Sequence, residues 1–424
     1  ALALLFFGVL LVNGFRKKTL DARQSLLGFV PMLITLTING IVSYFSFKVL
    51  KWLYPAYADI LHGFTYNGHT YIAAFVLFSL AICFWVYHKF KHINTPNLLV
   101  APIIIWLVIC GLVGTYLPGA SFFIIPLYAL LVSFMVIINQ KNPSAYLLVF
   151  LALPALFIYA PFIKMFPIGL GLKMMVATTL LTTLTFYLLL PVFGFYKNKH
   201  RLGILGLLLF MGFMVSAHIN SGFNEENAKP TSLLYVYDAN SNHAKWATYE
   251  QVISDWTSQY IGDTKKVPEK LADKTISSKY SSGFTYVTDA PIKEIIAPKI
   301  ETTLDTLIGN ERVLELCITP QRNVNRLEVF TNTVEIKKAV VNGIELSEHY
   351  LTHRKNGKLV THYISNNEYT EIRLTLPKDT PLELTLYEAS NDLLTNPQFT
   401  IPERPTNNIP MPFILNDAIL WTKT

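Results

Sequence analysis

Residues 97–116, NLLVAPIIIWLVICGLVGTY, run for twenty positions without a charged side chain. At about 1.5 Å per residue, a helix of this length crosses the roughly 30 Å hydrocarbon core of a bilayer. No water reaches the backbone there, so a spanning segment of this kind must be helical. The segment therefore predicts a transmembrane helix.

Further apolar runs surround this one in the first half of the chain. Together they predict about eight spans, at 1–14, 25–49, 70–88, 97–116, 121–139, 144–162, 168–195 and 202–219. Charged residues make up only 15% of the 424 residues, against about 25% in a typical soluble domain. This composition excludes a disordered chain, a coiled coil and an ordinary soluble enzyme. Three cysteines, Cys83, Cys110 and Cys317, are too few for a disulfide scaffold.

The basic residues are unevenly placed. Residues 1–224 hold 14 Lys/Arg and two acids, whereas residues 225–424 hold 21 Lys/Arg and 26 Asp/Glu. Alternate connections between the predicted spans carry ten and four Lys/Arg. The richer set is expected in the cytoplasm, which places both ends of the eight-span domain on the other side. Basic residues beside apolar runs indicate membrane topology, so we expect no nucleic-acid partner.

The composition changes after residue 219. Residues 220–290 are interpreted as a polar linker followed by a small α/β segment, with strands at 232–238 and 244–249, a helix at 250–260 and a surface loop at 261–283. Residues 291–424 predict a mainly antiparallel β-sandwich on the non-cytoplasmic side. Its predicted strands are 312–319, 325–331, 334–341, 344–346, 358–364, 370–376 and 382–388. Asn342-Gly343 predicts a type I′ hairpin turn, and the Pro-rich stretch 397–413 predicts an extended surface segment.

Residues with catalytic chemistry are scarce. The histidines of the first half lie near span ends, where interfacial polar residues are expected. They are His62, His69, His88, His92, His200 and His218. Glu348-His349 and His353 do not have the order of an HExxH zinc helix. No residue of this chain is therefore assigned as catalytic, cofactor-binding or metal-binding.

A transporter is one alternative, because polar residues inside spans can line a substrate path. Asn39 and Ser43 are the main polar residues of the second predicted span, and hydrogen bonds between helices explain them without a path. Lys164 and Lys173 flank the predicted connection 161–169 and can reach outward. Transport would require a hydrated cavity lined by Asn39, Ser43 or Lys173.

A set of short motifs appears in a characteristic order from about Lys51 to Thr424. They are Tyr66-Asn67-Gly68-His69, Leu117-Pro118-Gly119-Ala120-Ser121, Ser232 to Asn240 (SLLYVYDAN), Ala244-Lys245-Trp246-Ala247, Asp255-Trp256-Thr257, Arg404-Pro405, Pro410-Met411-Pro412 and Asn416-Asp417-Ala418. In this order they resemble the region that follows the catalytic domain in membrane-bound zinc exopeptidases of the aminopeptidase-Y-type family (M-twenty-eight). That family includes endoplasmic reticulum metallopeptidase and vacuolar membrane protease.

The resemblance implies a membrane-anchoring and C-terminal accessory region of a zinc-dependent exopeptidase. Its catalytic domain, with two zinc ions, has no counterpart in these residues and is expected upstream of Ala1 or on a separate subunit. The implied partners are that peptidase, a peptide substrate and the lipid bilayer. The alternative is a non-catalytic membrane protein whose extracytoplasmic β-domain binds a partner or serves assembly.

The outer connections 50–69 and 116–121 are candidates for contacts with the β-domain or the peptidase. The candidate contact residues are Trp52, Tyr54, Tyr66, His69, Pro118, Trp246 and Trp256. Short connections and the lack of a long Asn/Ser/Thr-rich region for glycosylation favour a bacterial inner membrane with both termini in the periplasm, whereas the few cysteines leave the redox compartment open. An endoplasmic reticulum or vacuolar membrane is the alternative.

Overall fold

The structure is a computed structural model that describes residues 1–262, 278, 280, 282–332 and 334–424. It consists of two compact units. The helical unit contains residues 1–57 and 62–222, and the β unit contains residues 58–61 and 223–424. The predicted loop at 261–283 lies largely outside the described residues.

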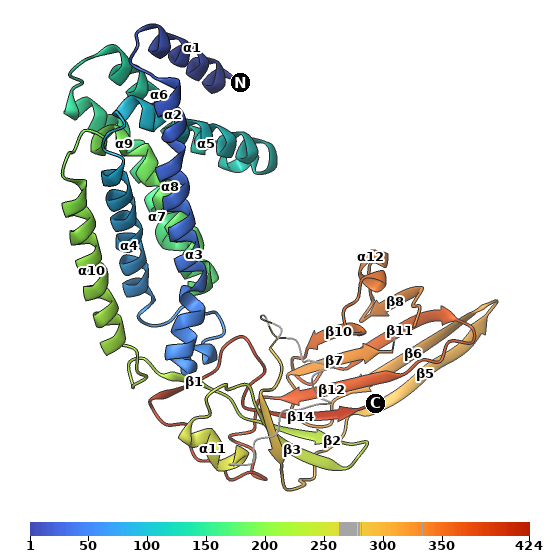
Figure 1. The fold of residues 1–424 in the computed structure, drawn as a ribbon. Helices are drawn as coiled ribbons and strands as arrows, with labels where there is room; N and C mark the ends of the chain where they lie inside the picture. Colours follow the sequence, from blue (N-terminus) through green and yellow to red (C-terminus); the bar gives the residue numbers. More distant parts are fainter. Residues whose placement is uncertain (263–277, 279, 281, 333) are drawn as a thin grey trace. The chain divides into compact units, whose positions relative to one another are not determined.

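The helical unit is built from long apolar helices (Figure 1). Its elements are α1 (Leu2–Arg16), α2 (Ala22–Leu27), α3 (Phe29–Leu53), α4 (Gly68–Lys89), α5 (Thr95–Tyr116), α6 (Ile124–Asn139), α7 (Ala145–Leu170), α8 (Met175–Leu188), α9 (Leu190–Phe193) and α10 (Lys199–Ile219), with the 3₁₀ turns η1 (Pro55–Asp59), η2 (Pro118–Phe123) and η3 (Leu172–Met174). In the described residues, six helical stretches are long and apolar enough to cross a membrane. The chain is therefore an integral membrane protein.

Two of the predicted spans correspond to helices that are too short to count as full membrane spans. The predicted spans 1–14 and 168–195 correspond to the apolar helices Leu2–Arg16 and Leu172–Leu188, which are below full spanning length. The predicted connection 161–169 is wrong, because α7 continues as a helix to Leu170. Neighbouring helices in a membrane protein satisfy the backbone groups that a proline frees, so Pro161 and Pro167 do not end α7. The helix ends at Gly171, whose φ of +84° suits glycine.

Small residues allow two helices of this unit to approach closely. On α10, a Cβ added at Gly206 would lie 2.9 Å from the Ala81 Cβ of α4, and one at Gly203 would lie 3.2 Å from the Ala81 carbonyl oxygen. An added Cβ thus has no room at Gly206 and little room at Gly203, in the way that membrane helices use small residues at interfaces. The main core holds Trp106, whose indole Nε1 donates to the Leu184 carbonyl at 3.1 Å.

The β unit contains two larger sheets and one short parallel pair. The strands are β1 (Lys229–Thr231), β2 (Leu234–Asp238), β3 (His243–Thr248), β4 (Tyr286–Asp289), β5 (Lys299–Ile308), β6 (Glu311–Thr319), β7 (Arg326–Thr331), β8 (Lys338–Val341), β9 (Ile344–Glu345), β10 (Lys358–Tyr363), β11 (Thr370–Pro377), β12 (Leu384–Ser390), β13 (Asn408–Pro410) and β14 (Ala418–Lys423). Two short helices, α11 (Asp255–Ile261) and α12 (Glu348–Thr352), complete it.

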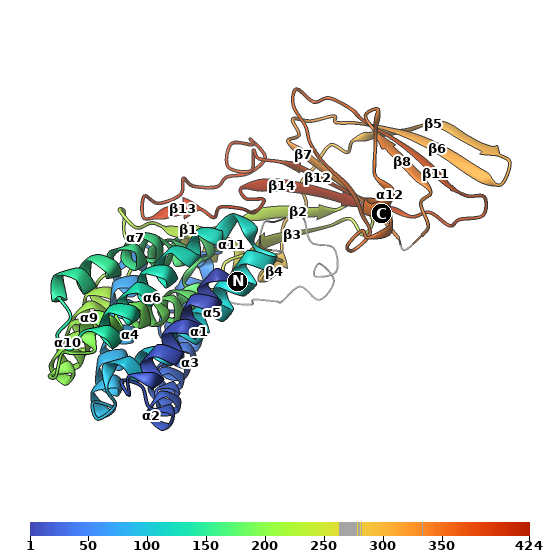
Figure 2. The same ribbon diagram turned by 90° about the horizontal axis from the view of Figure 1, so that it is seen from above.

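Within the described residues, the larger sheet has the order β10-β7-β12-β14-β2-β3-β4, and the smaller one β5-β6-β11-β8-β9 (Figure 2). Most pairs are antiparallel, as predicted, but β14 lies parallel to β2 and β1 lies parallel to β13. Strands β2, β3 and β4, which precede the predicted boundary at 290/291 and lie in the predicted small α/β segment, belong to the larger sheet. The composition changes at 220, but pairing between strands that lie far apart in the sequence leaves no mark on composition.

Buried apolar side chains pack on both faces of the larger sheet and form two layers. Leu327 and Val329 of β7 pack in a cluster that also contains Ile372 and Leu374 of the smaller sheet. Successive side chains of a strand alternate between faces, so Phe330 belongs to the opposite layer. That second layer includes Tyr387 of β12, together with Met411 and Leu415, which come from outside the strands. The segment before β14 therefore covers one face of the sheet.

Candidate functional site

The predicted contact residues fall into two groups. In the helical unit, Trp52 is 78% exposed, the Tyr54 hydroxyl lies 2.7 Å from His218 Nδ1, and the ring of His69 packs against Phe64. Tyr66 is also exposed there, and Pro118 begins η2. In the β unit, Trp246 and Trp256 are buried and both rings contact Tyr260. Their role in contacts with another domain stays a prediction.

Part of the predicted outer connection 50–69 groups with the β unit. Residues 58–61 belong to that unit, and within it Asp59 is fully buried. Its Oδ2 lies 3.3 Å from Lys229 Nζ, and its Oδ1 accepts from the Gln251 backbone N–H. Burial raises the pKa of Asp59 to about 6, while the nearby Lys229 charge opposes the rise. Asp59 is one of only two acids in the first 224 residues, and that isolation was its only signal in the sequence.

Lys229 connects Asp59 to a second buried acid, Glu250. Lys229 Nζ lies 3.0 Å from Glu250 Oε2. The carboxylate of Glu250 also accepts from the Ser232 and Ser254 backbone N–H groups, at 3.0 and 2.7 Å. A buried carboxylate with this many donors acts as a structural anchor, because every donor would lose a partner on its removal. The group fastens the start of β2 to the residues before α11.

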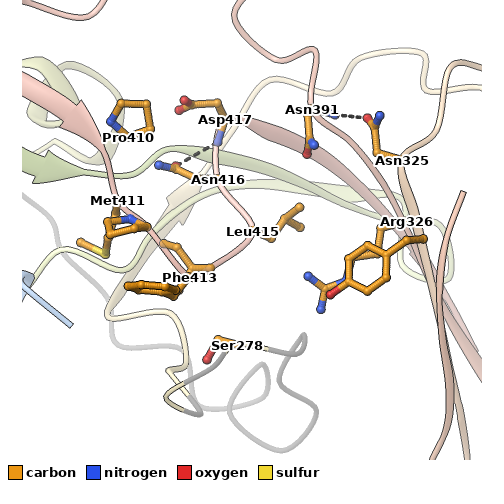
Figure 3. Close-up of a pocket in the computed structure, with 13 residues that line it drawn as sticks. Ser278, Asn325, Arg326, Asn391, Pro410, Met411, Phe413, Leu415, Asn416 and Asp417 are labelled. Atoms are coloured by element: carbon orange, nitrogen blue, oxygen red, sulfur yellow. Dashed lines mark hydrogen bonds between the residues drawn. The ribbon is translucent and has the colours of Figure 1, made fainter. Parts of the chain in front are cut away.

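A pocket of about 780 Å³ lies against the larger sheet of the β unit (Figure 3). We call residues 410–417, which form one wall, the strap. The opposite wall consists of Asn325, Arg326 of β7, Tyr363 of β10, and Asn391. The guanidinium carbon of Arg326 lies 5.4 Å from the centre of the Tyr363 ring. The pocket thus combines amides, one cation and aromatic rings, which suits recognition of a polar chain with apolar side groups.

The strap has an unusual backbone. Phe413 and Asp417 have φ values of +68° and +52°, although neither is glycine. Such a conformation costs about 1–2 kcal/mol for a residue with a Cβ, so it persists only where the surroundings impose it. Strained residues of this kind often occur at ligand-binding sites.

Hydrogen bonds hold the strap in this conformation. Arg404 donates to both carboxylate oxygens of Asp417, at 2.9 and 2.6 Å, and its guanidinium lies 4.6 Å from the centre of the Trp256 ring. Asn416 accepts from the Leu233 N–H at 3.1 Å and donates to the Thr231 carbonyl at 2.9 Å. The strap is therefore fixed at its end by one bidentate ion pair and one bidentate amide.

Charged side chains are buried near the same pocket. Arg322 donates to the Glu388 carbonyl at 2.9 Å, and its Nε lies 3.1 Å from the Glu388 carboxylate. The Glu388 side chain is 1% exposed. Burial raises the pKa of Glu388 to about 7, even though Arg322 favours the charged form. Sequence patterning missed this pair, because Glu388 occupies an inward position of a predicted strand.

The described residues offer binding chemistry more readily than catalytic chemistry. No group of three or more His, Cys, Asp or Glu side chains among them is arranged to hold a metal ion. Glu348, His349 and His353 lie at the short helix α12, where the two histidine rings are 4.2 Å apart. Asn39 and Ser43, the polar residues of the transport hypothesis, are buried and hydrogen-bonded to Thr183 and Thr179.

No protein-family model matches this sequence, and no curated protein or solved structure matches it either.

Proposed function

We propose that this chain is the membrane anchor and accessory β-domain of a zinc-dependent exopeptidase. One observation carries the proposal. Several motifs of the resemblance, although far apart in the sequence, meet at the strap: Arg404 pairs with Asp417, Asn416 binds the backbone beside Ser232, and Trp256 lies under Arg404. The motif residues that carry the resemblance therefore build the strap together. Motifs that share a function are expected to meet in space in this way.

In this proposal the peptidase supplies the chemistry and the β unit supplies binding. A catalytic domain with two zinc ions, joined to this chain or carried by a separate subunit, would activate water for attack on a peptide carbonyl. The β unit would hold an extended polypeptide in the pocket of about 780 Å³ beside the strap, which we call the strap pocket. Asn325 and Asn391 provide amides that match the donors and acceptors of a peptide backbone.

The first test is purification of the native protein from its membrane with a tag on the β unit. We expect hydrolysis of aminoacyl substrates, its loss on addition of a zinc chelator, and a polypeptide mass above 48.0 kDa or a co-purifying peptidase subunit. A single chain of 48.0 kDa without hydrolytic activity or bound zinc would contradict the proposal. The purified protein should also elute as one folded species, which separates true inactivity from loss of structure.

The strap pocket favours the second candidate function, a non-catalytic membrane protein that binds a polypeptide partner. A photo-crosslinking amino acid at Tyr363, which is 71% exposed beside the pocket, distinguishes the two. The same group at Tyr369, which is exposed but does not line the pocket, is the control. A cross-link to a zinc peptidase supports the first function. A cross-link from Tyr363 alone to an unrelated polypeptide supports the second.

We also propose the orientation in the membrane that the basic residues predict. The ends of the helices that carry Arg16, Lys89 and Arg201 would face the cytoplasm of a bacterial inner membrane, and both termini would face the periplasm. In a chain whose Cys83, Cys110 and Cys317 are replaced by alanine, cysteine introduced at Lys17 should react with an impermeant maleimide only after the cells are opened. Reaction in intact cells would reverse the orientation.

A further inference from the structure

Two adjoining pockets lie where α6 ends and α7 begins in the helical unit. The first, which we call the lysine pocket, has a volume of about 480 Å³ and is lined by Lys17, Gln140 and Lys141 among others. The second, the apolar pocket, has about 300 Å³ and is lined by Leu148 and Val192 among others. Lys141 and Phe195 line both. The two pockets thus share part of their lining, one charged and one aromatic residue, at the end of the membrane-spanning helices.

The two lysines carry charge that this unit does not neutralise. Lys17 Nζ donates to Asn139 Oδ1 at 2.5 Å, and Asn139 is itself fixed by donating to the Met135 carbonyl at 2.7 Å. Lys141 is exposed and has no carboxylate within 4 Å among the described residues. The acids of residues 1–222 are Asp21, which caps α2, and Asp59, which belongs to the β unit.

The start of α7 adds to the positive potential. Its N-cap residue Ser144 makes no side-chain capping bond, so the first N–H groups of this 26-residue helix have no side-chain acceptor there. The unpaired N–H groups and the aligned peptide dipoles of a helix start favour an anion. Ala145, in the first turn of α7, lines the apolar pocket together with Lys141, the residue that also lines the lysine pocket and is proposed below to hold a phosphate group.

We propose that this pair of pockets binds an anionic phospholipid. Lys17 and Lys141 hold the phosphate group, and the apolar pocket takes the first part of an acyl chain. Three observations converge: two uncompensated lysines, a second cavity that shares Lys141 and Phe195 with theirs, and a position at the ends of spanning helices, which is the depth of lipid head groups. Tyr146 is 90% exposed beside the site, as aromatic residues at the membrane interface often are.

The test uses the full chain in detergent, with native mass spectrometry to count bound phosphatidylglycerol during a titration. The double variant Lys17→Gln with Lys141→Gln should bind this lipid on the order of 25-fold more weakly, since each lysine near a head group contributes about fivefold. The arginine pair, K17R with K141R, should stay within about threefold of wild type. The control variant K164Q with K173Q removes the same charge at the other end of α7 and should bind normally.

A comparison of ligands distinguishes a lipid site from a site for free phosphate. Phosphatidylcholine, which has the phosphate but no net charge, should bind more weakly than phosphatidylglycerol. Inorganic phosphate at 10 mM should not displace the lipid; displacement, or phosphate binding without lipid binding, would overturn the proposal in favour of a free-phosphate site. Equal loss of lipid from the double variant and the control would overturn it as well. Unchanged melting temperatures would show that the variants are folded.

Discussion

At the scale of single residues, the buried acids of the β unit make its stability depend on pH. The surroundings of each acid determine whether stability rises or falls with pH. Glu388 has a pKa raised from its ordinary 4.5 to about 7 in the folded protein. The native state therefore binds more protons than the unfolded state between these two values. Stability consequently falls as the pH rises through this window, because ionisation leaves a charge in a buried site.

We predict that the β unit is less stable at pH 8 than at pH 5, by up to about 3 kcal/mol from Glu388 alone. Glu388→Gln imitates the protonated form, so it should remove the Glu388 part of this fall and flatten the profile, leaving the part that comes from Asp59. Hydrogen exchange of β12 amides in the full chain, corrected for intrinsic rates, measures this. A wild-type profile that rises between pH 5 and 8 would contradict the sign.

A second prediction concerns the ion pair that holds the strap. Arg404→Ala leaves Asp417 without its bidentate partner in a mostly buried site, which should destabilise the β unit by about 2–4 kcal/mol. Arg312 forms the same bidentate arrangement with Asp305 in an exposed position. Arg312→Ala should therefore cost less than about 1 kcal/mol. Chemical unfolding of both variants tests the difference, and equal losses would refute the argument.

At the scale of elements, α3 and α8 are joined by a row of buried polar contacts. Thr35 meets the Tyr187 hydroxyl at 2.6 Å, Asn39 donates to Thr183 Oγ1 at 2.7 Å, and Ser43 meets Thr179 Oγ1 at 2.6 Å. The contacting residues are spaced by four positions in α3 and also in α8, so the row follows one face of each helix. Such contacts stabilise membrane helix pairs by about 0.6 kcal/mol each on average.

This arrangement predicts that the row is dry. Cysteines introduced singly at Asn39 and Ser43, with Cys83, Cys110 and Cys317 replaced by alanine, should not react with a water-soluble maleimide. Ser241→Cys, in the exposed turn between β2 and β3 of the β unit, should react and serves as the control. Rapid labelling at Asn39 or Ser43 would instead indicate a hydrated path and favour transport.

The sequence predicts well those elements that depend only on neighbouring residues, such as tight turns. The Asn342-Gly343 turn connects β8 and β9 with φ values of +47° and +78°, as a type I′ turn requires. β14 was missed, because its residues follow a Pro-rich stretch and its partners β2 and β12 lie far away in the sequence. The strap pocket was missed for the same reason: Arg326, Tyr363 and Asn391 meet the strap only through the sheet.

At the scale of the whole molecule, the two units have separate cores. A chain that stops after residue 417 lacks β14, the central strand of the larger sheet. We predict that this truncation unfolds the β unit but leaves the helical unit folded in detergent. Circular dichroism should show lost strand signal with retained helix signal. Removal of Thr424 alone is the control, and loss of helix signal in the truncated chain would show that the units fold together.

The parallel pairing of β14 with β2 also has a consequence during protein synthesis. Residues 234–238 leave the ribosome about 180 residues before residues 418–423, the strand that must be inserted beside them. At typical translation rates this delay is roughly 10–40 s. During that time one edge of β2 is without its final partner and can pair with the wrong strand or with another chain. The larger sheet is complete only when synthesis has passed residue 423 and β14 has been inserted between β2 and β12.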